Sequence, residues 1–193
     1  MPARILVIAA TTAPGAPCAR LAAEAARLLS LSDAQTTLIS LADYPLPLHD
    51  PDLAASGVPP LAQALAHRIA RQDGLFLSVC EIDGSLPALT KNMLEWTGRL
   101  QTVAGRVRRP YEALPVAIGA AGASGRSNAA ALAAAELCFT ALGAERLEPS
   151  LDAPDFPAEF DETGRLSRGP TLRSLEHLVE QLLEHTHAIG RLA

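Results

Sequence analysis

The sequence predicts a doubly wound α/β fold, with one parallel sheet and helices on both of its faces. Three observations predict this fold. The length of 193 residues suits a single domain with a full core. Short apolar runs alternate with helical patterns, and no internal repeat interrupts them. Strands that alternate with helices need crossover connections, which make neighbouring strands parallel.

The expected strands are five apolar, partly β-branched runs. Apolar runs of this length, bounded by turn residues, are typical of strands that are buried on both faces of a parallel sheet. The last run is the weak one of the five. The runs are Arg4 to Ala9, Thr36 to Leu41, Gly74 to Val79, Leu114 to Gly119 and Arg146 to Leu151.

The expected helices lie between and after these strands, with apolar residues at helical spacing. In the first helix, Leu21, Leu28 and Leu29 fall near one face. Proline stands at three helix starts, where a helix tolerates it, and Gly143 follows one helix as a stop. The helices are Arg20 to Leu31, Pro60 to Gln72, Pro87 to Leu100, Ser127 to Leu142 and Thr171 to Ile189.

Five strand and helix units of this length match the flavodoxin-like version of the fold, with five parallel strands in the order 2-1-3-4-5. A Pro-rich connection runs from Ala42 to Pro60. The first strand is not followed by Gly-x-Gly-x-x-Gly, which argues against a Rossmann dinucleotide site.

Composition and charge argue against several classes of partner. The net charge of −5 does not favour a nucleic-acid surface, and we interpret the stretch from Arg106 to Arg109 as a solvated loop. No apolar run approaches the roughly 18 residues of a membrane helix. The N-terminus also lacks a signal-peptide pattern. We therefore expect a cytoplasmic protein that binds neither nucleic acid nor membrane.

Other catalytic chemistry lacks a signal in the sequence. The last helix carries His185 and His187, which do not share a helical face, so we expect no metal ligands there. Neither a Gly-x-Ser-x-Gly elbow nor a Walker loop is present. Nothing therefore indicates a hydrolase or a nucleotide phosphatase.

The three cysteines, Cys18, Cys80 and Cys138, are widely spaced and outside any Cys-x-x-Cys motif. This pattern favours free thiols over a disulfide framework or a zinc site. Cys18 and Cys80 nevertheless fall at the mouths of adjacent expected strands. One hypothesis is that they approach each other as a redox pair, but we favour two unrelated buried thiols.

The fold itself predicts where a ligand binds. In an open parallel sheet, ligands bind beyond the carboxyl ends of the strands at the switch point, here formed by the first, third and fourth strands. Three loops meet there: Ala10 to Ala16, Cys80 to Leu86 and Gly119 to Arg126. The third loop is rich in glycine, which suits either close approach to a flat ligand or an ordinary strand-to-helix turn.

The segment CEIDGSLPALTKNMLEW, from Cys80 to Trp96, resembles the signature of the NADPH-dependent FMN reductase family. The segments from Asp43 to Asp52 and from Phe160 to Leu166 resemble further parts of the family. The resemblance implies a flavodoxin-like fold and FMN bound at the three loops. It also implies that NADPH or NADH reduces a flavin, a quinone or another small acceptor, in a homodimer or homotetramer. The positions that match without a gap are Glu81, Gly84, Ser85, Pro87, Lys91, Asn92 and Trp96.

Within this segment, the N–H groups from Ile82 to Ser85 are expected to donate hydrogen bonds to the polar edge of the flavin. Ser85 or Leu86 is expected near the cap of the next helix, with Pro87 in its first turn. We expect Lys91 and Asn92 to tie this loop down and Trp96 to lie in the core or a subunit interface. Two positions depart from the family pattern, because Cys80 replaces a proline and Ile82 replaces a tyrosine.

The first loop, ATTAPGAPCARLA, departs further from the family. Of the family's polar positions in this loop, only the Thr11 hydroxyl survives. Each lost hydroxyl or charged contact to a phosphate is worth about 1 to 3 kcal/mol. The positive end of the helix and the N–H groups of residues 12, 13, 15, 16 and 18 remain. In a less favoured hypothesis, Arg20 turns back to supply the missing charge.

We expect no catalytic side chain. Two functions remain open: an FMN-dependent NAD(P)H oxidoreductase, or a diverged family member that binds little or no FMN and has no reductase activity. The residues expected to bind the cofactor are Thr11, Thr12, Ala13, Ala16, Cys18, Cys80, Glu81, Ile82, Asp83, Gly84, Ser85, Ala121 and Gly122.

Overall fold

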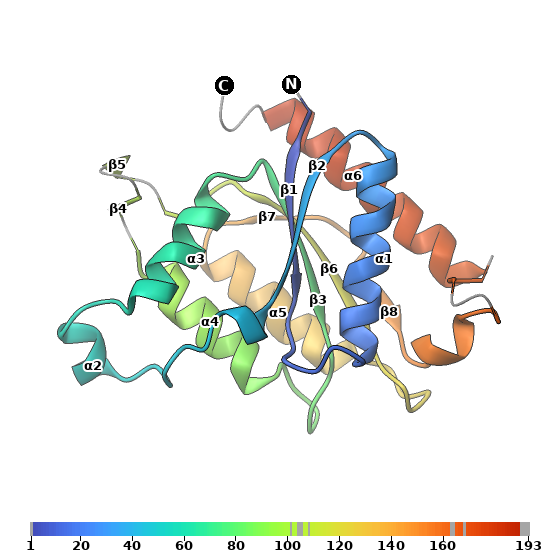
Figure 1. Ribbon diagram of the computed structural model, residues 1–193, viewed down its shortest axis with the longest axis horizontal. Coiled ribbons are helices and arrows are strands. Elements are labelled where there is room, and N and C mark those ends of the chain that lie inside the picture. Colours follow the sequence, from blue (N-terminus) through green and yellow to red (C-terminus); the bar gives the residue numbers. More distant parts are fainter. Residues whose placement is uncertain are drawn as a thin grey trace.

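The computed structural model describes residues 2–100, 102–103, 106–107, 109–162, 165–167 and 169–189. It confirms the flavodoxin-like architecture, in which a parallel sheet forms the middle layer (Figure 1). The order β2-β1-β3-β6-β7 is the predicted 2-1-3-4-5, and β8 also pairs with β6. The strands of this sheet are β1 (Arg4–Ala9), β2 (Gln35–Ser40), β3 (Gly74–Val79), β6 (Pro115–Ala121), β7 (Glu145–Arg146) and β8 (Leu151–Ala153).

The helices form two outer layers. Side chains alternate along β1, so that Ile5 and Val7 pack with one layer and Leu6 and Ile8 with the other. No helix in the described part of the chain has the length and apolar character to cross a bilayer. One face is covered by α1 (Pro17–Leu31) and α6 (Pro170–Ile189), the other by α3 (Pro60–Ala70), α4 (Ala88–Gly98) and α5 (Ala129–Ala141).

The fifth predicted strand, Arg146 to Leu151, is wrong as a single element. The structure divides it into β7 and β8, both parallel to β6. Pro149 lies between them and has no N–H for the ladder, so continuous pairing stops there. The sheet position is as predicted, but two short strands share it.

Two parts of the chain contain short helices that were not predicted. The connection between β2 and α3 holds a 3-10 helix, η1 (Leu41–Asp43), and a short helix, α2 (Pro51–Ala55). Asp50 caps α2, because its Oδ1 accepts hydrogen bonds from the N–H groups of the second and third helical residues. A second 3-10 helix, η2 (Phe156–Glu159), follows β8.

The stretch from Arg106 to Arg109 is also corrected. It was expected as a solvated loop, but its first two residues form β5 (Arg106–Val107), which pairs with β4 (Thr102–Val103) in an antiparallel ladder. A ladder of this length leaves no periodic pattern to detect. Arg109 is exposed, and Arg108 lies outside the described residues.

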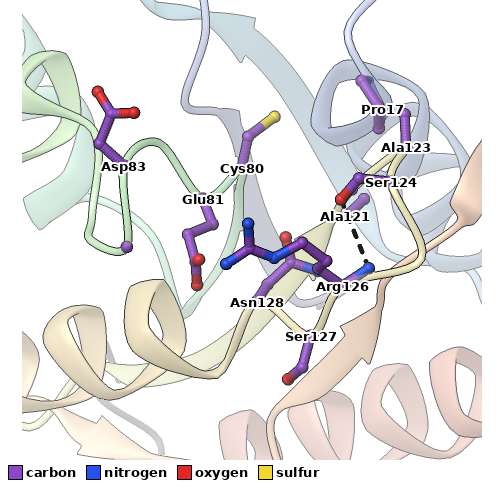
Figure 2. Close-up of a pocket in the computed structure, with 12 residues that line it drawn as sticks. Pro17, Cys80, Glu81, Asp83, Ala121, Ala123, Ser124, Arg126, Ser127 and Asn128 are labelled. Carbon is purple, nitrogen blue, oxygen red and sulfur yellow. Dashed lines mark hydrogen bonds between the residues drawn. The ribbon is translucent and has the colours of Figure 1, made fainter.

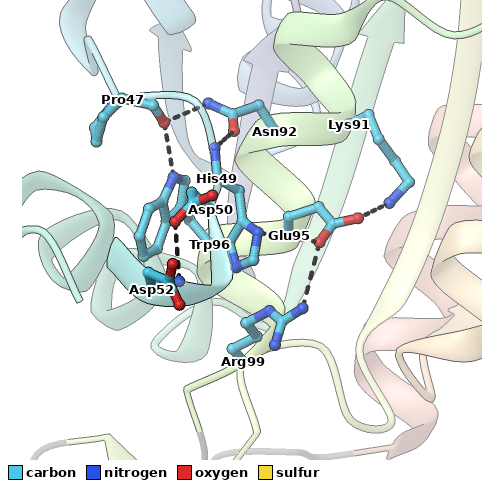
Figure 3. A network of polar contacts seen from close by, with 9 residues as sticks. All are labelled: Pro47, His49, Asp50, Asp52, Lys91, Asn92, Glu95, Trp96 and Arg99. Atoms are coloured by element: carbon cyan, nitrogen blue, oxygen red, sulfur yellow. Dashed lines mark hydrogen bonds and ion pairs between the residues drawn. The ribbon is translucent and has the colours of Figure 1, made fainter. Parts of the chain in front are cut away.

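Asn92 and Trp96, on α4, fasten the connection that follows β2 (Figure 3). Asn92 Oδ1 accepts a hydrogen bond from the His49 N–H at 2.7 Å, and Asn92 Nδ2 donates one to the Pro47 carbonyl at 2.9 Å. Trp96 Nε1 donates to the same carbonyl at 2.8 Å, and its ring is buried. Of the two expected alternatives for Trp96, the core and a subunit interface, the structure places it in the core. Asn92 has a structural role, but for this connection rather than the loop from Cys80 to Leu86.

Glu95, which lies between Asn92 and Trp96 in the sequence, is the centre of a charged network on α4 (Figure 3). It pairs with Lys91 and lies 3.6 Å from Arg99 and 3.7 Å from the His49 ring. The hydrogen bond from Lys91 is the main reason that the pKa of Glu95 lies below its usual value. Lys91 thus stabilises α4. The expectation that Lys91 and Asn92 tie down the loop from Cys80 to Leu86 is therefore wrong.

The Asn92 hydrogen bonds give a prediction for stability. In Asn92→Ala, the His49 N–H and the Pro47 carbonyl lose their bonds to a buried amide. We expect the free energy of unfolding to fall by about 1 to 3 kcal/mol, measured by urea denaturation. Gln63→Ala removes an amide that donates to the Val58 carbonyl from an exposed position, and we expect little change. Equal losses in the two variants would contradict the structural role of Asn92.

Candidate functional site

A cavity of about 590 Å³ opens where β3 and β6 end beside the start of α1 (Figure 2). Its volume is within the range typical of small-molecule and cofactor sites. The cavity lies at the switch point of the sheet, where the sequence analysis expected a ligand. It is lined by Pro17, Cys80, Glu81, Asp83, Gly84, Ala121, Gly122, Ala123, Ser124, Arg126, Ser127 and Asn128.

Some of the expected cofactor residues line this cavity and others do not. Those on the cavity wall are Cys80, Glu81, Asp83, Gly84, Ala121 and Gly122. Cys18 is buried directly behind Cys80. Outside the lining are Thr11, Thr12, Ala13, Ala16, Ile82 and Ser85. The cofactor contacts of both groups stay predictions.

Several lining residues were missed by the sequence analysis. The most notable are Arg126, Ser127 and Asn128, which precede α5. The sequence does carry a signal for them, because the polar run SGRSN directly follows an apolar strand and a glycine-rich loop. Polar side chains at the carboxyl end of a parallel strand are well placed to contact a ligand.

The second loop is a tight turn. The N–H of Ile82 donates to the carbonyl of Ser85 and the N–H of Ser85 to that of Ile82, both at 3.1 Å. Asp83 and Gly84 between them have φ angles of 50° and 74°, as a type I′ turn requires. This corrects the expectation for the N–H groups from Ile82 to Ser85. Only those of Asp83 and Gly84, at the tip, lack a partner among the described residues.

The start of α4 also differs from the prediction. The helix begins at Ala88 with Pro87 as its N-cap, and no side chain caps it. Ser85 is instead held in the turn by its backbone. Leu86 directly precedes this cap, so it lies near the helix start as expected, whereas Pro87 is the N-cap itself and not part of the first turn.

The third loop is held by β8 and the residues after it. Asp152, on β8, accepts hydrogen bonds from the Ser127 hydroxyl and from the backbone and side-chain nitrogens of Asn128. The N–H of Gly122 donates to the Ala153 carbonyl at 2.9 Å. These hydrogen bonds hold the loop at both of its ends, at Gly122 and at Asn128, without any ligand.

Three charged residues line the cavity: Glu81 and Asp83 from the second loop and Arg126 from the third. Glu81 lies near the N-terminus of α5, and its Oε2 accepts a hydrogen bond from the Ala131 N–H at 3.4 Å. A carboxylate is favoured there by the helix dipole. The Arg126 guanidinium extends between Glu81 and Asn128 (Figure 2), and it has no hydrogen-bond or ion-pair partner among the described residues. Arg126 is therefore available to an anionic ligand.

The first loop leaves fewer free donors than expected. The N–H of Ala13 donates to Thr11 Oγ1, and that of Ala16 donates to the Ala13 carbonyl, both at 3.1 Å. Among the described residues, the N–H groups without a partner in this loop are those of Thr12, Gly15 and Cys18. Cys18 lies in the first turn of α1, which no side chain caps, and Thr12 and Gly15 precede the helix. This helix start still favours an anion through its dipole.

Arg20 does not supply the charge that this loop lacks. Its guanidinium stacks on the Phe160 ring, 3.6 Å from the ring centroid. A cation over an aromatic face is stabilised by the ring quadrupole. The less favoured hypothesis that Arg20 turns back toward the loop therefore finds no support in the structure.

Cys18 and Cys80 form a disulfide, with their Cα atoms 5.5 Å apart. The favoured interpretation of two unrelated thiols is wrong, and Cys138 is the free cysteine. The two residues meet because β1, which leads to Cys18, lies next to β3, which leads to Cys80. Ser78 adds to this junction, since its hydroxyl donates to the Cys18 carbonyl at 2.7 Å and its carbonyl accepts from Ala10.

No group of three or more His, Cys, Asp or Glu side chains in the described part of the chain is arranged to hold a metal ion. The homodimer or homotetramer implied by the resemblance stays a prediction.

Gly122 gives a prediction about the third loop. A Cβ at Gly122 would lie 2.9 Å from the Pro154 carbonyl oxygen, which belongs to the backbone and cannot move aside cheaply. We expect Gly122→Ala to lower the free energy of unfolding by about 1 to 3 kcal/mol in urea denaturation. The matched control is Gly15→Ala, where a Cβ meets nothing within 4 Å. A Gly122→Ala protein as stable as this control would show that the loop is not fixed as described.

Comparisons with known proteins agree with this geometry. None of the curated protein sequences matches the chain. The NAD(P)H:(acceptor) oxidoreductase FerB from Paracoccus denitrificans is 19% identical, with a TM-score of 0.74 over 96% of this chain and 98% of FerB. An oxidoreductase from Corynebacterium diphtheriae is 15% identical, with a TM-score of 0.64 over 97% and 96%. The apo form of the NADH:FMN oxidoreductase EMOB is 18% identical, with a TM-score of 0.69 over 94% and 89%.

At these identities the three structures establish the fold alone. The family is established by the sequence itself, because the model of the NADPH-dependent FMN reductases matches residues 3–150. This match includes all three loops around the cavity. The chain belongs to the NADPH-dependent FMN reductase family.

Proposed function

We propose that this protein is an FMN-dependent oxidoreductase that uses NADPH or NADH to reduce a flavin, a quinone or another small acceptor. The observation that carries the proposal is the cavity at the switch point, surrounded by N–H groups and an arginine that have no partner within the described ranges. Family membership supports the same cofactor.

The residues around the cavity fit FMN, which combines a flat ring with an anionic phosphate. The cavity volume of about 590 Å³ suits a ligand of this size. At Gly84, which lines the cavity, a Cβ would meet nothing within 4 Å, so the turn tip faces open space. FMN, when bound, supplies the two-electron chemistry that links a nicotinamide donor to an acceptor.

In this proposal the backbone binds and orients the cofactor. The N–H groups of Asp83 and Gly84 donate to the polar edge of the ring. The start of α1, with the N–H groups of Thr12, Gly15 and Cys18, binds the phosphate. Because the hydride chemistry belongs to the cofactor, no side chain is needed as an acid or base.

Arg126 supplies a positive charge that the first loop no longer carries. Its guanidinium has no partner among the described residues, and it faces the cavity that Pro17 of α1 also lines. A guanidinium forms strong, charge-assisted hydrogen bonds to phosphate oxygens. We assign the Arg126 side chain to the FMN phosphate.

A second candidate function rests on the first loop. Its donors are reduced to backbone N–H groups, because Ala13 and Ala16 occupy positions that are polar in the family and Pro14 and Pro17 have no N–H. A diverged member of the family, with the fold but little or no FMN and no reductase activity, would have this loop.

A flavin titration separates the two functions. We expect the purified protein, with its disulfide intact, to bind one FMN per chain and to quench its fluorescence. NADPH or NADH is then expected to bleach the absorption of the bound flavin under anaerobic conditions. A protein that stays colourless after incubation with excess FMN would contradict the proposed function and support the second candidate.

The assignment of Arg126 gives a separate prediction. We expect Arg126→Gln to weaken FMN binding by about tenfold, through loss of a charged hydrogen bond, and to leave riboflavin binding unchanged. Riboflavin is the right comparison because it has the same ring without the phosphate. Arg71→Gln, at an exposed arginine at the opposite end of the sheet, serves as the control. Equal losses for FMN and riboflavin would assign Arg126 to the ring instead.

A further inference from the structure

We propose that the Cys18–Cys80 disulfide is a redox switch for FMN binding, so that the disulfide form binds FMN tightly and the dithiol form binds it weakly. The inference rests on the proposed function. It concerns a feature that the family signature does not contain, because Cys80 replaces a proline of that signature.

The argument for the switch is the position of the disulfide. Cys18 is the second residue of α1, where the phosphate is proposed to bind, and Cys80 directly follows β3 and begins the loop whose turn is proposed to contact the ring. The bond therefore fixes the distance between the two parts of the cofactor site. A site that is fixed before binding loses less conformational entropy, so its affinity is higher.

The two sulfurs differ in access, which defines how the switch operates. Cys80 lines the cavity and is half-buried, whereas Cys18 is fully buried. A thiolate of a small dithiol that enters the cavity attacks Cys80 Sγ and forms a mixed disulfide. The bond between the protein sulfurs breaks, and its electron pair passes to Cys18 Sγ.

The second thiol of the dithiol then displaces Cys80 Sγ and closes the reagent into its own disulfide. In total, two electrons and two protons pass from the dithiol to the cysteine pair. FMN in the cavity would cover Cys80, so it should also protect the disulfide. Linkage requires this reciprocity, because each equilibrium changes the other by the same factor.

The test compares FMN affinity in the two redox states. FMN is titrated into the wild-type protein before and after treatment with dithiothreitol, with thiols counted in each sample. We expect reduction to weaken FMN binding by about tenfold, within the range typical of coupled sites. Cys138→Ser should keep this response, because Cys138 lies on α5, outside the cavity. The double variant Cys18→Ser, Cys80→Ser should bind FMN equally with and without dithiothreitol.

The outcomes separate the switch from the proposed function. No FMN binding in either redox state would overturn the proposed function and the switch with it. Binding with equal affinity in both states would overturn the switch and leave the proposed function intact.

A second measurement tests how accessible each of the two cysteines is. In the Cys138→Ser background, each cysteine of the pair is left alone by replacing the other with serine. We expect Cys80 to react with a maleimide at least about tenfold faster than Cys18, as exposed thiols do compared with buried ones. FMN should slow the reaction of Cys80. A Cys18 thiol that reacts as fast as Cys80 would overturn the proposed route of reduction.

Discussion

Parallel pairing of β1, β3 and β6 is the constraint on which the rest of the structure depends. It brings the carboxyl ends of three strands to one edge of the sheet. Residues far apart in the sequence meet there, such as Cys18 and Cys80, which are separated by 62 positions. The disulfide and the hydrogen bonds of Ser78 then join two of the three loops. Asp152 fixes the third loop, so the cavity is built largely from fixed backbone.

This arrangement explains how a weak phosphate loop is compatible with a flavin site. The first loop offers N–H groups and a helix dipole in place of charged or hydroxyl side chains. Arg126 brings a cation from the other side of the cavity, while Glu81 is occupied at the start of α5. The charge needed for an anionic ligand is therefore present, but it comes from a loop where the family signature does not place it.

Local patterns predicted the fold well, and tertiary contacts account for most of what was missed. β1 and β3 have the predicted bounds, because apolar runs between turn residues specify buried strands. The prediction of one continuous fifth strand is wrong at Pro149, because proline has no N–H for the ladder even within an apolar run. Asn92, the Cys18–Cys80 bond and the stacking of Arg20 on Phe160 each depend on a partner at least 40 residues away. No local pattern carries that information.

In the proposed function, three loops at one edge of the sheet form an FMN site that the disulfide holds together. The decisive measurement is a crystal structure of the oxidised protein with FMN. We expect the flavin ring between the turn at Gly84 and the loop at Gly122, with the phosphate within hydrogen-bond distance of the start of α1 and of Arg126. FMN bound elsewhere, or an empty cavity at saturating FMN, would overturn this assignment.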